Sequence, residues 1–118
     1  MTIPTPYLSQ QPVDDFGLRF SNFLFSVTLN ATTDTTLTVP ITASRFKALI
    51  KHKVGTNVWV SVNNVATIPA GNTFANTQSE LINGTLCREV KSGDVLHFIT
   101  STASTDVSVA FYALGTNN

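Results

Sequence analysis

The sequence carries little charge. Only 12% of its 118 residues are Asp, Glu, Lys or Arg, about half of the roughly 25% that is usual in a globular domain. Seven Lys and Arg balance seven Asp and Glu, so the formal net charge is zero. Because binding to a polyanion normally requires excess positive charge, we expect no nucleic-acid partner. A chain without net charge is also poorly protected against self-association.

Cysteine and long apolar runs are scarce as well. Cys87 is the single cysteine, which excludes an internal disulfide. The six glycines are scattered singly, without the spacing of a phosphate-binding loop. No apolar run approaches the roughly 18 residues that cross a bilayer, and the start of the chain lacks the basic and apolar regions of a signal peptide. We therefore expect no membrane partner, and synthesis in a reducing cytoplasm.

Threonine and valine are abundant, with 18 and 12 copies, and eight Phe accompany them. Such β-branched and aromatic residues favour strands. Residues 23–29, 45–54, 58–62 and 107–113 alternate apolar and polar positions, and turn residues recur about every ten residues. Two of these turns, at residues 55–57 and at Asn83-Gly84, are typical of hairpins.

This pattern predicts an all-β fold: a β-sandwich or jelly roll of about seven or eight short antiparallel strands. We expect one domain over residues 21–114, followed by a polar tail at 115–118. Residues 1–20 differ in composition, because Pro4, Pro6 and Pro12 favour extended chain there. We interpret them as an extended N-terminal arm.

Aromatic and acidic residues gather where this arm meets the domain. Phe16 and Phe20 precede Phe23 and Phe25, and they either close the core of their own domain or dock on a neighbouring subunit. The adjacent Asp14 and Asp15 point apart on an extended chain, which does not suit a catalytic pair. These two carboxylates either solvate the arm or meet a basic partner.

The sequence shows no group of residues with the pattern of a catalytic or metal site. His52 and His97 are far apart in the chain, lie in the apolar-facing sets of their strands, and have no clustered Cys or His around them. Cys87 with His97 as a base is the remaining nucleophile hypothesis, but a lone strand thiol is usually a small core residue. We expect no enzyme activity, no catalytic residues, no cofactor and no metal.

Four of the seven basic residues occupy odd positions of one expected strand: Arg45, Lys47, Lys51 and Lys53. They project from one face, opposite Phe46, Ala48 and Ile50. Three interpretations stay open: a solvated face, edge-strand lysines that block unwanted pairing, or a stripe that meets an acidic patch on a partner protein. Nucleic acid is disfavoured because no aromatic side chains interleave with these charges.

Several segments carry a resemblance to a known class of proteins: Phe46-Lys-Ala-Leu-Ile, Gly55-Thr-Asn-Val-Trp-Val-Ser-Val, Ile68-Pro-Ala-Gly, Gly93-Asp-Val-Leu-His-Phe and Asp106-Val-Ser-Val-Ala-Phe-Tyr-Ala-Leu. With them the chain resembles small virion structural proteins of tailed bacteriophages, of the capsid cement or decoration type. The resemblance implies a β-sandwich or jelly roll, often with an N-terminal arm, on the capsid surface of a virion made in a bacterial host cytoplasm. It assigns a role to no individual residue.

For the function, the resemblance implies a protein that binds the major capsid protein and stabilises the head, as a homo-oligomer for which a trimer is favoured. Candidate interface residues are those singled out above: Asp14, Asp15, Phe16, Phe20, Arg45, Lys47, Lys51 and Lys53. The alternative is a receptor- or carbohydrate-binding module of a phage tail or fibre. Its Asn- and Thr-rich loops suit sugars, but Trp59 is the only Trp.

Overall fold

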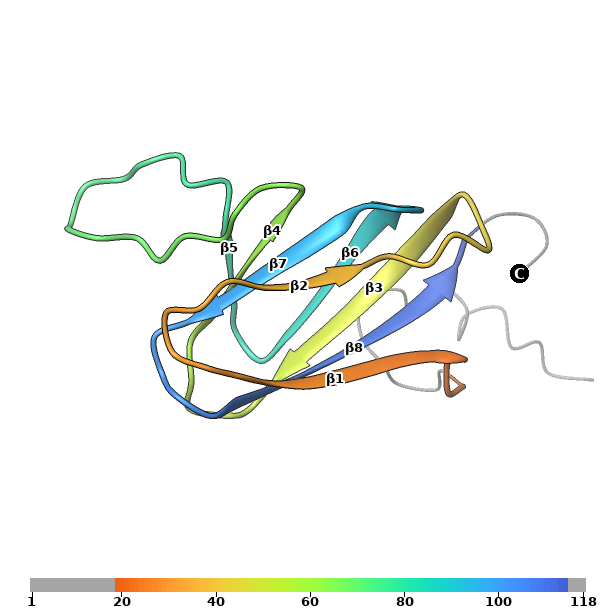
Figure 1. The fold of residues 1–118 in the computed structure, drawn as a ribbon, viewed down its shortest axis with the longest axis horizontal. Coiled ribbons are helices and arrows are strands. Elements are labelled where there is room, and N and C mark those ends of the chain that lie inside the picture. The colour runs from red at the N-terminus through yellow and green to blue at the C-terminus, as the bar shows by residue number, and fades with distance from the viewer. Residues whose placement is uncertain (1–18, 115–118) are drawn as a thin grey trace, which may run out of the picture.

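The protein is all-β. The structure is a computed structural model that describes residues 19–114, in which eight strands and no helix occur. In chain order the strands are β1 (Phe23–Leu29), β2 (Thr35–Thr38), β3 (Arg45–His52), β4 (Val58–Val62), β5 (Glu80–Ile82), β6 (Thr85–Lys91), β7 (Val95–Thr100) and β8 (Thr105–Ala113), as Figure 1 shows. The predicted number of short strands is confirmed. Within this range no helix is long and apolar enough to cross a membrane.

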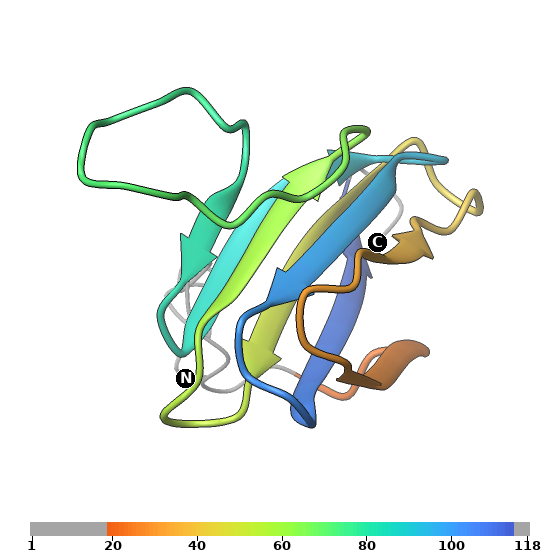
Figure 2. The same cartoon turned by 60° about the vertical axis from the view of Figure 1, so that its left-hand side comes forward.

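The strands form two four-stranded sheets that pack face to face (Figures 1 and 2). The first sheet, sheet A, has the order β1-β8-β3-β6, and the second, sheet B, has the order β2-β7-β4-β5. Every pair of neighbouring strands is antiparallel. Because successive side chains of a strand point to opposite faces, each sheet has one inner face and one outer face.

The core lies between the inner faces. Phe46 of β3 and Phe111 of β8 are completely or almost completely buried, and their rings meet edge to face with centroids 6.2 Å apart. Phe23 packs on Phe46 in the same manner, at 6.1 Å. Burying an aromatic side chain stabilises a fold by roughly 1.5–3 kcal/mol. Of the two interpretations of the Phe residues between positions 16 and 25, closure of the core of their own domain is therefore confirmed for Phe23.

The two turns that the sequence marks as hairpins do not form hairpins. The turn at Gly55 (φ 84°) joins β3 of sheet A to β4 of sheet B, and the turn at Gly84 (φ 86°) joins β5 of sheet B to β6 of sheet A. Glycine relieves the steric cost of positive φ in both turns. Only β4 and β5 are consecutive strands that pair. Among residues 19–114 the chain therefore crosses from one sheet to the other at the six remaining connections between strands.

The connection between β4 and β5 is a long loop, residues 63–79, that projects from the sandwich (Figures 1 and 2). Ala66, near its start, is buried, and its backbone N–H donates to Asp34 Oδ1 at 3.0 Å. Asp34 precedes β2, and its other oxygen, Oδ2, lies 2.9 Å from His97 Nδ1. This side chain therefore fastens the base of the loop to the β1–β2 connection.

Candidate partner interface

The basic stripe consists of Arg45, Lys47, Lys51 and Lys53, and the first three lie on the outer face of sheet A. In β3, Phe46, Ala48 and Ile50 are buried in the core, so the alternation predicted from the sequence is confirmed. Lys47 and Lys51 point outward, but Leu49 between them is also buried, which divides the stripe. All three basic residues within β3, Arg45 included, therefore face away from the core.

β3 is an interior strand of its sheet. It pairs with β6 on one side and with β8 on the other, each over seven residue pairs. The interpretation of the stripe as edge-strand lysines is therefore wrong, because an interior strand has no unpaired edge to protect. A solvated face and a contact with an acidic partner remain as the two interpretations.

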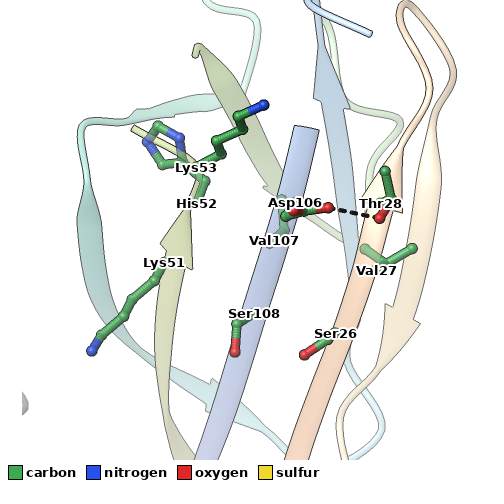
Figure 3. A pocket seen from close by; sticks show the side chains of 9 residues that line it. All are labelled: Ser26, Val27, Thr28, Lys51, His52, Lys53, Asp106, Val107 and Ser108. Atoms are coloured by element: carbon green, nitrogen blue, oxygen red, sulfur yellow. Dashed lines mark hydrogen bonds between the residues drawn. The ribbon is translucent and has the colours of Figure 1, made fainter. Parts of the chain in front are cut away.

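Lys53 is separate from the rest of the stripe. β3 ends at His52, and the backbone N–H of Lys53 donates to the carbonyl oxygen of Asp106 at 2.9 Å. Figure 3 shows the Lys53 side chain directed away from that of Lys51. The prediction that all four basic side chains share one face therefore holds only for the three within the strand.

Carboxylates partly neutralise the outer face of sheet A. Arg45 Nη1 donates to Glu89 Oε2 at 2.7 Å, and Lys47 is the cross-strand partner of the same Glu89. Lys91 lies opposite Arg45, while Asp106 lies on β8. The outer faces of these strands thus present four cationic and two acidic side chains. This face has a net positive charge on a chain whose sum is zero.

Hydrogen-bond donors form a row across this face. In register, Ser26 of β1 lies beside Ser108 of β8, Ser108 lies beside Lys51 of β3, and Lys51 lies beside Thr85 of β6. Ser26, Ser108 and Lys51 line an open depression of about 550 Å³, and Figure 3 shows the two serines near each other with the Lys51 side chain directed away from them. Three residues with hydroxyl groups and one lysine on neighbouring strands of this face suit the carboxylates of an acidic protein surface.

Phe20 lies beside a second hollow on the same face. This hollow has a volume of about 370 Å³ and shares Ser26, Lys51 and Ser108 with the first. The Tyr112 hydroxyl donates to the backbone carbonyl of Arg19 at 2.6 Å and holds the chain there, while the Phe20 side chain is 90% exposed. Its role at an interface stays a prediction. Three other candidates lie outside the described residues: Asp14, Asp15 and Phe16.

The two histidines belong to different sheets. His52 accepts a hydrogen bond from the Gly84 N–H through Nε2 at 2.9 Å, and its Nδ1 lies 3.1 Å from the Thr56 hydroxyl. His97 lies on the outer face of sheet B, since Leu96 and Phe98 point into the core. The prediction that His97 belongs to the core-facing set of its strand is wrong. Leu96, Phe98 and Thr100 of β7 face the core, and His97 belongs to the alternate set with Val95 and Ile99.

Cys87 and His97 do not form a nucleophile and base pair. Cys87 lies on the outer face of β6 in sheet A, whereas His97 lies on the outer face of sheet B, so the two side chains point away from each other. Burial raises the pKa of the Cys87 thiol, an effect that Lys47 and Arg88 partly oppose. A raised pKa lowers the thiolate fraction, opposite to the shift of an activated cysteine.

Trp59 lies on the outer face of sheet B. It is half-buried, and its cross-strand partners are Leu81 of β5 and Ile99 of β7. The indole therefore packs within an apolar row of its own sheet. Residues 19–114 contain no group of three or more His, Cys, Asp or Glu that could hold a metal ion.

An apolar groove that the sequence did not predict lies at the edge formed by β1 and β2. The groove has a volume of about 180 Å³, and most of its walls are apolar side chains of both sheets. Phe25 and Val27 point toward the core side of sheet A but remain 37% and 40% exposed. The available signal was the absence of charge from Phe20 to Thr33, but the alternating pattern alone does not say which strand lies at an edge.

Comparison with protein-family models finds no match for this chain, and neither the curated proteins nor the solved structures include one that is significantly similar to it.

Proposed function

We propose that the eight strands form a jelly roll. The order β1-β8-β3-β6 against β2-β7-β4-β5 supports this arrangement, since the first strand lies beside the last and the second beside the seventh. Nested pairing of this kind is what two Greek keys produce when eight strands fold into two sheets. Jelly rolls are common in viral capsid domains and in lectins.

We further propose that the protein is a non-enzymatic virion structural protein, a capsid cement or decoration protein that binds the major capsid protein and stabilises the head. The donor row and the net positive charge on the outer face of sheet A carry this proposal. An acidic surface on the capsid is the complementary partner, because opposite potentials favour docking and fix its orientation.

The physical basis of stabilisation is the number of contacts. A subunit that touches several neighbours adds a modest interface with each, and the second contact forms at a high effective concentration once the first has formed. Separating capsid subunits then requires breaking all these interfaces together. A rigid two-sheet body suits this role, since little flexibility is lost on binding.

The direct test compares phage particles with and without the protein. We expect particles that lack it to release DNA at a lower temperature, and electron microscopy of complete particles to show added density on the capsid surface. Equal heat resistance of both particle types would contradict the proposal. Density on the tail together with specific binding on a glycan array would instead support the carbohydrate-binding alternative.

The docking face has its own test. Lys47→Gln with Lys51→Gln removes two positive charges from the outer face of sheet A. We expect about tenfold weaker binding to capsids at low salt, with less salt dependence, since each partly exposed ion pair contributes up to about 1 kcal/mol. The matched control is Ala70→Asp with Asn72→Asp, which changes the net charge equally at exposed positions of the 63–79 loop. Equal affinity of both double variants would contradict the assignment of this face.

A further inference from the structure

In the part of the chain that the structure describes, the sandwich has two open edges, and one of them carries the usual protection against strand pairing. β5 and β6 form this edge, and β5 has only three residues. β6 carries Arg88, Glu89 and Lys91, all exposed. Arg88 also forms an ion pair with Glu80 of β5, which ties the two sheets together there. Short edge strands and charged side chains are the devices by which proteins prevent edge-to-edge association.

The other edge, formed by β1 and β2, lacks this protection on its longer strand. β1 has seven residues and, among the described residues, pairs only with β8. From Phe20 to Thr33 the chain contains no charged residue, no proline and no glycine. Within residues 19–114 the backbone groups of β1 on the side away from β8 have no partner strand, so they are an open template for a further antiparallel strand.

The side chains of β1 indicate the position of that further strand. Phe25 and Val27 point toward the core side, yet a third or more of each remains exposed because sheet A ends there. They form one wall of the 180 Å³ groove, which Phe98 and Leu37 of sheet B complete. A strand added beside β1 would place its own inward side chains over this groove.

We propose that the added strand is β1 of a second copy of this chain, paired antiparallel about a two-fold axis at Ser26. In this register Phe25 lies opposite Val27 of the other copy, and Leu24 lies opposite Thr28. Apolar residues meet apolar residues on the inward side, and Ser26 meets Ser26 on the outer side. The two four-stranded sheets A become one continuous eight-stranded sheet.

Self-complementarity favours a second copy over a partner of different sequence. The edge has no charge that would select a charged peptide, and a charged strand would have to place ionic side chains over an apolar groove, which is costly. The two-fold register contains no opposed like charges, and its apolar cross-strand pairs stabilise the contact. A two-fold contact of this kind is the commonest closed symmetry of homo-oligomers.

This contact does not depend on a capsid role. It produces a dimer, whereas the resemblance to cement proteins favours a trimer, so the mass in solution distinguishes the two. Loss of the dimer would leave the capsid proposal untouched, and failure to bind capsids would leave the dimer untouched.

The experiment is sedimentation analysis of the full-length protein and two lysine variants. Val27→Lys places a charge at the unprotected edge, and Leu81→Lys places one at β5 of the opposite edge, where the wild-type side chain is similarly exposed (43% against 40%). We expect the wild type and Leu81→Lys to sediment as dimers and Val27→Lys as a monomer. A wild type that is monomeric or trimeric, or Val27→Lys that remains dimeric, would overturn the proposal.

Hydrogen exchange on the wild type keeps the test independent of how Val27→Lys folds. The amides of β1 that face away from β8 should exchange at least tenfold more slowly at a concentration where the dimer forms than at high dilution. The amides of β6 should exchange equally at both concentrations. Equal exchange of β1 at both concentrations would contradict the pairing.

Discussion

At one edge of the sandwich, an ion pair and a row of charged residues lie across two strands, one of them only three residues long. At the other edge, seven uncharged residues of β1 lie beside an apolar groove. Both edges end four-stranded sheets of the same core, so the contrast does not come from the architecture. Natural proteins usually protect their edge strands against association. The absence of this protection at β1 identifies the surface where another strand is expected.

The largest expected effect concerns the buried side of the groove. Phe98 of β7 is only 2% exposed and lines both the core and the groove. Phe98→Ala should lower the free energy of unfolding by about 3–5 kcal/mol, because a buried aromatic is lost and a cavity remains. Urea denaturation measures this value. A loss of unfolding free energy below about 1 kcal/mol would contradict this prediction, because it would mean that neighbouring side chains fill the space that Phe98 leaves.

A concentration-dependent effect is expected at the rim of the same groove. Phe25 is 37% exposed and meets Phe111 edge to face at 5.8 Å. Phe25→Ala should cost about 1–3 kcal/mol in dilute solution, less than at Phe98, because only part of the ring leaves water on folding. At concentrations where copies pair, the loss should grow, since the second copy covers this ring. If Phe25→Ala lowered the unfolding free energy equally at both concentrations, no second copy would cover this ring, which would contradict pairing at the β1 edge.

The β1–β2 connection next to the unprotected edge depends on Asp34. Its carboxylate accepts from the Ala66 N–H and lies against His97. Asp34→Ala should cost about 1–3 kcal/mol in unfolding free energy, since it leaves both partners without their acceptor. Asp34→Asn is the control, because it retains an oxygen for the Ala66 N–H and should lose less. Equal losses in both variants would show that the charge, and not the backbone hydrogen bond, fixes the loop.

The ion pair at the protected edge should contribute little to stability. Arg88 and Glu80 are each about half exposed, and exposed pairs are typically worth up to about 1 kcal/mol. A double-mutant cycle with Arg88→Ala and Glu80→Ala should give a coupling energy in that range, while the double variant should associate more readily than the wild type. A coupling energy well above about 1 kcal/mol, with no increase in self-association of the double variant, would indicate that the ion pair stabilises the fold and does not prevent strand pairing at this edge.

The smallest expected effect is the pH dependence from Cys87 on β6. Burial raises the pKa of this thiol in the folded protein. Below the ordinary cysteine pKa the thiol is neutral in both states, so its contribution to stability is fully present. As the pH rises, the unfolded chain ionises first and this contribution is lost. Between pH 7.5 and pH 10 the free energy of unfolding should therefore fall more for the wild type than for Cys87→Ala. An equal fall in both proteins would contradict the raised pKa of this thiol.

The sequence predicted the strands better than their pairing. Alternation placed Phe46, Ala48 and Ile50 in the core and Lys47 and Lys51 outside, because a two-residue period is a local property. The same local signals failed at Asn83-Gly84, where a turn that suits a hairpin instead crosses between sheets. Which strands pair depends on contacts between residues far apart in the chain, such as Phe23 with Phe111, and no local pattern encodes them.

The candidate interfaces show the same division. The basic residues of β3 were identified by their spacing, but only the strand order shows that β3 is interior and that its lysines protect no edge. The uncharged stretch from Phe20 to Thr33 is visible in the sequence. It becomes informative only once β1 is known to end its sheet, with Phe25 and Val27 left partly uncovered.

Disulfide trapping tests the difference between the two edges most directly. In a Cys87→Ala background, Ser26→Cys places a thiol on the proposed two-fold axis, where paired residues lie about 4.5–5.5 Å apart between Cα atoms, within the range of a disulfide. Thr85→Cys places one on β6 as the control. Under mild oxidation, Ser26→Cys should form a covalent dimer in high yield while Thr85→Cys stays monomeric. No dimer with Ser26→Cys, or equal dimer with both, would contradict pairing along β1.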